Sequence, residues 1–197
     1  MTSPGEGVID VALRVADALE SIGAEYFLGG SLASSIDGEP RATNDIDFVV
    51  DVPLGRIGDL VRELGSDFEI DVAMLRDAIL HGRSANAFYL PLVMKIDIFG
   101  HAHGPFDEME FARRRTVSVQ DGRSLYVKSP EDTILRKLLW YREGGEVSDR
   151  QWRDVLGVLR ARAGKLDDAY LRSWASRLEL TTLMERAQEQ SLPREAG

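Results

Sequence analysis

A Gly-Gly-Ser turn followed a short distance later by two aspartates constrains this chain more than any other feature of its sequence. The turn spans Gly29–Ser31, and thirteen residues separate it from Asp45, which lies one residue before Asp47. The acids open an apolar run at 45–52 that predicts a strand, and residues i and i+2 of a strand point to the same face. The sequence therefore predicts two carboxylates side by side at the start of a strand.

The turn and the acid pair predict two adjacent binding functions. Two carboxylates this close repel each other unless a cation lies between them, and their hard oxygen atoms suit Mg²⁺ or Mn²⁺. The glycines precede a predicted helix, and the first backbone N–H groups of a helix bind phosphate readily. Gly29 and Gly30 alone are also consistent with a plain strand-to-helix corner, so the prediction depends on their distance from Asp45. Together the two motifs predict metal-assisted phosphoryl or nucleotidyl transfer.

A third carboxylate lies in the second strongly apolar run, LVMKIDIF at 92–99. In a strand, Lys95 and Asp97 share a face, and a charged residue in such a strand is rarely buried without a partner. If this strand neighbours the strand at 45–52, three carboxylates converge, as two-metal transfer sites require. The third carboxylate would then also serve as general base for an attacking hydroxyl. The alternative is an exposed Asp97 at a strand end, with Lys95 offsetting its charge rather than contacting a substrate.

The hydrophobic pattern predicts an α+β fold, with a short mixed β-sheet flanked by helices and a helical part after it. Period-2 runs predict strands, and 3.6-residue periods bounded by caps predict helices. We expect an α/β core at 1–128 and a C-terminal helical region at 129–197, which opens with the helix-start signal Ser129-Pro130-Glu131-Asp132. The expected strands are 26–28, 45–52, 67–72, 87–90, 92–99, 116–119 and 125–127. The expected helices are 9–22, 32–36, 53–64, 73–80, 106–113, 130–142, 149–162, 167–176 and 181–190.

The composition restricts the location and the partners of the protein. The 197 residues contain no cysteine, no apolar run near the length of about 20 that spans a membrane, and no signal-peptide pattern at the N-terminus. We therefore expect a cytoplasmic protein that does not bind membranes. The net charge of −9 does not attract polyanions, so a nucleic-acid partner needs a local basic patch. Arg113–Arg115 is one candidate, and a solvated helix end is the alternative.

The sequence resembles the nucleotidyltransferase superfamily of the polymerase-β type. The resemblance is carried by Gly30-Ser31, Asp45-Ile46-Asp47 and Lys95-Ile96-Asp97. Within that superfamily, GGSLASSIDGEPRATNDIDFVV most resembles the bacterial branch that contains toxins of type IV toxin–antitoxin systems and related uncharacterised proteins. The helical segment EDTILRKLLWYREGGEVSDRQWRDVLGVL is similar to the helical segment of that branch, so the resemblance covers about 26–160.

The resemblance implies roles for the three acids and the turn. Asp45, Asp47 and Asp97 would ligate Mg²⁺ or Mn²⁺, and Asp97 would also act as the base. Gly30 and Ser31 would hold the β- and γ-phosphates of a nucleoside triphosphate.

Further nucleotide-binding residues are implied on either side of the acids. Arg41 and Thr43 match an Arg-x-Ser/Thr element before the acid pair, and strand phasing would place Thr43 on the face of the acids. Lys95 and Lys137 complete the expected nucleotide-binding set. Lys137 matches a helical lysine that approaches the phosphates, although a lysine whose head reaches water is an equal alternative. Asp154 matches the Asp of an Arg-Asp element.

The function that this resemblance implies is metal-dependent transfer of a nucleoside monophosphate from a triphosphate to an acceptor hydroxyl, with release of pyrophosphate. The acceptor would be RNA, a protein or a small molecule, and a toxin would have an antitoxin-like partner. The sequence departs from the pattern of that branch in two ways that affect the choice of acceptor. Residues 143–147 are interposed before the Arg-Asp element, and the chain is acidic.

The sequence is also consistent with other interpretations. The chain could be a catalytically inactive nucleotide-binding module that acts through a partner protein. Asp-x-Asp also occurs in metal-dependent glycosyltransferases, which usually have a longer nucleotide-binding unit before the acids. His101 and His103 form a pair that could bind metal, but the sequence shows no further ligand nearby. We therefore interpret the two histidines as loop residues.

Overall fold

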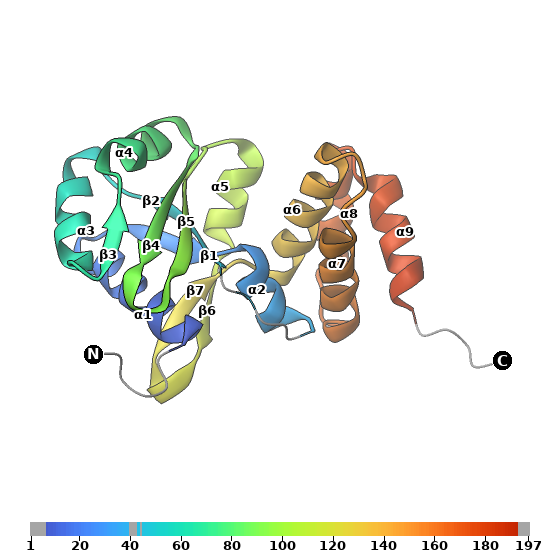
Figure 1. Ribbon diagram of the computed structural model, residues 1–197. Helices are drawn as coiled ribbons and strands as arrows, with labels where there is room; N and C mark the ends of the chain where they lie inside the picture. The colour runs from blue at the N-terminus through green and yellow to red at the C-terminus, as the bar shows by residue number, and fades with distance from the viewer. Residues whose placement is uncertain (1–6, 40–42, 44, 193–197) are drawn as a thin grey trace. The chain divides into compact units, whose positions relative to one another are not determined.

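The computed structural model describes residues 7–39, 43 and 45–192, and it contains a seven-stranded mixed sheet flanked by helices (Figure 1). The α+β class expected from the sequence is confirmed. The strands are β1 Glu25–Leu28, β2 Asp45–Asp51, β3 Phe68–Ile70, β4 Ser84–Tyr89, β5 Met94–Gly100, β6 Arg115–Ser118 and β7 Ser124–Val127. The helices are α1 Val8–Ser21, α2 Gly30–Asp37, α3 Ile57–Leu64, α4 Val72–His81, α5 Pro105–Ala112, α6 Pro130–Glu143, α7 Asp149–Ala161, α8 Asp168–Arg177 and α9 Thr181–Ser191.

The sheet places the two acid-bearing strands next to each other at its centre. The strand order is β3-β4-β5-β2-β1-β7-β6. β2 pairs with β5 in parallel, and β1 pairs with β7 in parallel, whereas the other neighbours are antiparallel. The sheet is therefore mixed, as the sequence pattern predicts.

One face of the sheet is buried and the other carries the acids. Ile46, Phe48 and Val50 alternate with the aspartates along β2 and are almost wholly buried. α1 and α4 pack against this buried face: the Arg14 guanidinium of α1 donates to the Tyr89 hydroxyl of β4 over 2.6 Å. A Cβ added at Gly100 would lie 2.3 Å from a carbonyl oxygen of α4. The helices therefore cover the apolar face and leave the acids on the opposite face.

The third strand is shorter than the sequence pattern predicts. The expected strand at 67–72 is observed only at Phe68–Ile70, because the next helix begins earlier than expected. The Asp71 carboxylate accepts hydrogen bonds from the backbone N–H groups of Ala73 and Met74 and so caps α4. The capping geometry of Asp71 ends the strand that its apolar neighbours would otherwise continue.

The residue contacts divide the chain into two compact units. Among the described residues, the first comprises 7–32, 43 and 45–128, and the second comprises 33–39 and 129–192. The second unit contains helices α6 to α9, and its first helix is capped by Ser129, whose hydroxyl accepts from the Asp132 N–H over 3.1 Å. Residues 33–39 belong to this unit, and within it Asp37 forms an ion pair 2.6 Å long with Arg162 at the α7 C-terminus. The sequence pattern alone assigned this segment to the α/β core. Among the helices of the described residues, none has the length and apolarity to cross a membrane.

Candidate active site

The pairing of β2 with β5 brings the predicted acids to adjacent positions. Asp47 lies opposite Asp97 in the parallel register, and Asp45 lies opposite Lys95. Paired residues of neighbouring strands point to the same face, so all four side chains lie on the face opposite the helix-covered core. This convergence requires the two strands to be neighbours, and they are neighbours.

The Gly-Gly turn lies directly beside the acid pair. The Gly29 N–H donates to the Asp47 carbonyl oxygen over 2.9 Å, where β1 runs antiparallel to β2. Gly30 has a φ of +55°, and a Cβ there would lie 1.8 Å from Asp47 Oδ2. Only glycine leaves room for the Asp47 carboxylate at this point and also accepts the left-handed backbone.

Lys95 is a cation on the same sheet face as the three carboxylates and pairs with Asp97. Its Nζ lies 2.7 Å from Asp97 Oδ1 and 2.8 Å from Asp97 Oδ2. The hydrogen bond to Asp97 raises the pKa of Lys95, and the charges of Asp97, Asp45 and Asp47 raise it further against the opposing effect of burial. Lys95 therefore stays protonated well above neutral pH, with its ammonium held by the Asp97 carboxylate.

The donor set fits a hard divalent cation. The three groups are carboxylates on one sheet face. Their negative charges favour a positive charge nearby, as the raised pKa of Lys95 shows. Oxygen donors of this kind suit Mg²⁺ or Mn²⁺. Among the described side chains, the three aspartates do not bring their oxygens within 4.8 Å of one another as a group. Asp45, Asp47 and Asp97 are thus residues that could hold such an ion, and their role as ligands stays a prediction.

The other residues expected around the nucleotide are placed less completely. Ser31 lies in the first turn of α2, whose N-terminus carries partial positive charge and suits phosphate. β2 begins at Asp45, so strand phasing does not extend to Thr43, whose hydroxyl donates to the Asp45 carbonyl oxygen over 3.1 Å. Arg41 lies outside the described residues.

Lys137 and Asp154 of the second unit form a buried ion pair. Lys137 Nζ lies 2.8 Å from Asp154 Oδ2, and their side chains are 4% and 7% exposed. Gln151 accepts a second hydrogen bond from the same ammonium over 3.1 Å. The ammonium does not reach water, so the snorkelling interpretation of Lys137 is wrong. Whether Lys137 also contacts a nucleotide stays a prediction.

Two residues near the turn and the acids were missed in the sequence analysis. Lys128, at the end of β7, extends beside Gly29 and over the Phe27 ring, and its Nζ lies 2.8 Å from Glu110 Oε1. Asn86 of β4 lies opposite Asp97 in the register and shares its face. The scarcity of lysine in this arginine-rich chain was the signal that could have drawn attention to Lys128.

Comparison with solved structures agrees with this architecture. A nucleotidyltransferase-like protein of Paracoccidioides brasiliensis is 18% identical, with 91% of each chain covered and a TM-score of 0.57. A protein of Thermotoga maritima described as a nucleotidyltransferase is 16% identical, with 74% of this chain and 92% of that chain covered and a TM-score of 0.52. The chain has the nucleotidyltransferase fold.

A third similar structure is the antibiotic-resistance factor ANT(2'')-Ia. It is 14% identical, with 90% of this chain and 96% of that chain covered and a TM-score of 0.52. No protein-family model matches the sequence, and no curated protein matches it. The similarity to these solved structures therefore shows the fold alone.

Proposed function

We propose that this protein transfers a nucleoside monophosphate from a nucleoside triphosphate to an acceptor hydroxyl. The observation that carries the proposal is the register of β2 and β5, which sets Asp47 opposite Asp97 with Asp45 on the same face. The nucleotidyltransferase fold supports the same reaction class. A fold alone hosts many chemistries, so the proposal depends on the acids and on the glycine turn beside them.

In this proposal the triphosphate binds between the turn and the acids. Gly30 and Ser31, in the first turn of α2, hold the β- and γ-phosphates, because a helix N-terminus favours anions. Asp45, Asp47 and Asp97 would hold Mg²⁺ or Mn²⁺, which supplies charge neutralisation at the α-phosphate when bound.

Asp97 acts as the general base for the acceptor. The hydroxyl proton passes to an Asp97 oxygen as the hydroxyl oxygen forms a bond to the α-phosphorus. The bond from the α-phosphorus to the bridging oxygen of the β-phosphate breaks, and pyrophosphate leaves with that electron pair. Lys95 bonds both Asp97 oxygens, and because a base needs a free oxygen we infer that Lys95 turns from Asp97 toward a phosphate during the reaction.

The acceptor of this reaction needs a free hydroxyl group. RNA, a protein and a small molecule all carry hydroxyl groups, and the net charge of −9 favours an acceptor that is not a polyanion. The resemblance to toxins of type IV toxin–antitoxin systems makes a toxin with an antitoxin-like partner a second candidate. Growth arrest on expression, relieved by Asp47→Asn, would distinguish the toxin from a housekeeping or antibiotic-modifying enzyme.

The reaction is tested by following a triphosphate labelled at the α-phosphate with Mg²⁺ and candidate acceptors. We expect label to appear on an acceptor with stoichiometric release of pyrophosphate. Asp47→Asn should abolish transfer and leave the fold intact, because it removes charge without removing volume. Asp51→Asn is the matched control, since Asp51 lies exposed at the far end of the same strand and on the same face.

Two results would contradict this mechanism. Transfer activity retained in Asp47→Asn would show that the acids do not carry the reaction. Binding of one equivalent of triphosphate without any pyrophosphate release would instead support the inactive nucleotide-binding module.

A further inference from the structure

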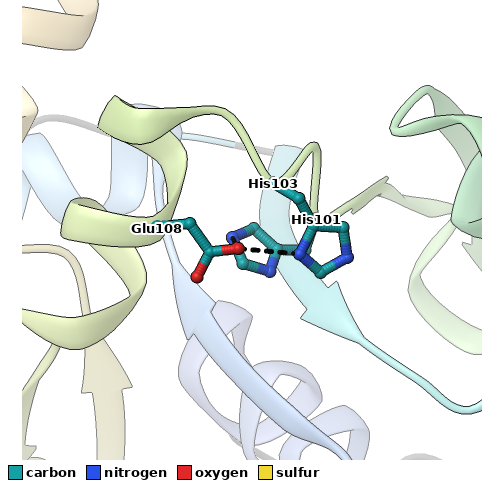
Figure 2. A group of neighbouring side chains, drawn as sticks. All are labelled: His101, His103 and Glu108. Atoms are coloured by element: carbon teal, nitrogen blue, oxygen red, sulfur yellow. Dashed lines mark hydrogen bonds and ion pairs between the residues drawn. The ribbon is translucent and has the colours of Figure 1, made fainter.

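A cluster of two histidines and a glutamate lies at the end of β5, away from the three aspartates. His101 and His103 follow the strand directly, and Glu108 comes from α5 (Figure 2). One ligand atom from each side chain lies within 4.8 Å of the others. His101 follows Asp97 by four residues, which corresponds to about 13 Å along an extended strand. The cluster is therefore separate from the proposed catalytic acids.

His101 is the unusual member of this cluster. Its side chain is only 5% exposed, and neither ring nitrogen has a hydrogen-bond partner among the described residues. Buried polar groups normally have a partner, and a buried group without one calls for an explanation. The ring stacks on Phe111 with its Nε2 directed to the cluster, 3.9 Å from Glu108 Oε1.

His103 is held in the cluster by its backbone and by Glu108. Its φ of +55° is rare for a residue other than glycine and is often found at functional sites. Its Nδ1 lies 2.9 Å from Glu108 Oε1, as the dashed line in Figure 2 shows. The two imidazole rings lie with their centroids 4.2 Å apart. The loop conformation thus turns an exposed imidazole back toward the buried one.

The separations from Glu108 to the two histidines are close to those of a tetrahedral transition-metal site. Zinc binds nitrogen and oxygen ligands at about 2.0–2.1 Å in tetrahedral geometry, which sets ligand atoms about 3.3 Å apart. The distances of 2.9 Å and 3.9 Å from Glu108 Oε1 to the two histidines lie on either side of that value. Two imidazoles and a carboxylate suit Zn²⁺ and similar transition metals, whereas Mg²⁺ prefers oxygen ligands.

We propose that His101, His103 and Glu108 form a binding site for one divalent transition-metal ion of the Zn²⁺ type. The ion would coordinate His101 Nε2, His103 Nδ1 and Glu108 Oε1, and it would displace the proton shared by His103 and Glu108. It would fasten α5 to the end of β5, since Glu108 lies on the helix and His101 follows the strand. This site takes a different metal from the one that the aspartates would hold.

The test is a titration of tag-free, chelator-treated protein with Zn²⁺ and with Co²⁺ in excess Mg²⁺. We expect one tightly bound equivalent of Zn²⁺ and a higher Tm with Zn²⁺. Bound Co²⁺ should show a visible absorption spectrum that indicates a low coordination number. His103→Gly and Glu108→Gln should each weaken Zn²⁺ affinity by at least about tenfold. Even the loss of a residue that only hydrogen-bonds to a metal ligand weakens metal affinity by about tenfold or more. Both positions are exposed, at 62% and 58%, and glycine accepts the positive φ.

Two control variants separate this site from other metal-binding groups. His81→Ala removes an exposed histidine of α4 that pairs with Asp77, and Asp47→Asn alters the proposed catalytic acids. Both should bind Zn²⁺ as the wild type does. Absence of Zn²⁺ binding by the wild type in excess Mg²⁺ would overturn the proposal. So would affinity unchanged in both His103→Gly and Glu108→Gln, or affinity lost in either control.

Discussion

At the scale of single residues, the close approach of Gly30 to Asp47 is the tightest steric constraint at the proposed active site. A Cβ at Gly30 would overlap the Asp47 carboxylate, with separations of 1.8 Å to Oδ2 and 2.3 Å to Cγ. The turn and the acid pair are thus fitted to each other, which explains why the distance between them in the sequence is informative. Any side chain at Gly30 must displace the acid or the turn.

We predict that Gly30→Ala lowers nucleotide transfer at least about 100-fold, because a displacement of about 1 Å at a reacting group can have that effect. The positive φ and the overlap should also lower the free energy of unfolding by about 1–3 kcal/mol. The measurements are kinetics and urea denaturation. Gly58→Ala is the matched control: Gly58 is exposed in α3 with nothing within 4 Å of its added Cβ, and alanine there should stabilise by about 0.5–1 kcal/mol. Full activity of Gly30→Ala would refute the proposed role of this turn.

Lys95 gives a second prediction at the residue scale, because it occupies the position among the acids that a divalent cation would take. Lys95→Met removes the ammonium that bonds Asp97. We predict that the variant binds Mn²⁺ more tightly than the wild type without nucleotide, measured by the Mn²⁺ concentration that gives half of the maximal rise in Tm. Unchanged or weaker Mn²⁺ binding would contradict a direct competition between the ammonium and the metal.

The raised pKa of Lys95 sets the pH range of its contribution to stability. A group whose pKa is higher in the folded state stabilises the fold below its unfolded pKa of about 10.4 and ceases to do so as the pH rises through the folded value. The stability difference between wild type and Lys95→Met should therefore be constant from about pH 6 to 9 and change only in more alkaline solution.

At the scale of elements, the pair of Lys128 with Glu110 joins the end of β7 to α5. Both side chains are almost fully buried, 5% and 4% exposed, so removal of one charge leaves the other buried and without this ion pair. We predict that Lys128→Met lowers the free energy of unfolding by about 3–5 kcal/mol, and that Lys128→Met with Glu110→Met recovers most of this loss. Urea denaturation measures both.

Lys165→Met is the control for the buried pair, because Lys165 is exposed in the turn before α8. It should change the stability by no more than about 0.5 kcal/mol. A Lys128→Met variant as stable as Lys165→Met would mean that the buried pair does not hold these elements together.

Elements were more predictable from the sequence than contacts between them. The period-2 runs at β2 and β5 identified both acid-bearing strands, because one of their faces is buried and the other is not. The pairing of Lys128 with Glu110 was not predictable, since it depends on β7 lying beside β1. The approach of Glu108 to His103 was not predictable either, because it requires a left-handed residue in a short loop. Local patterns carry no signal for such a turn.

At the scale of the whole molecule, charge restricts which acceptor the protein can bind. The chain carries 33 acidic residues against 24 basic residues, so general attraction to RNA is weak. Arg114, which belongs to the basic run Arg113–Arg115, pairs with Glu25 and lies over the Phe111 and Tyr126 rings. These contacts favour a structural role for Arg114 over a nucleic-acid patch.

The measurement that most directly tests the central claim is thermal melting of the whole chain with each of the four nucleoside triphosphates and Mg²⁺. We predict that at least one triphosphate raises the Tm in a Mg²⁺-dependent manner, with about 2.7 kcal/mol of stabilisation at 100 times its Kd. The rise should be lost in Asp47→Asn and retained in Asp51→Asn. No rise with any triphosphate, or an equal rise in Asp47→Asn, would contradict a nucleotide site built on the acids of β2 and β5.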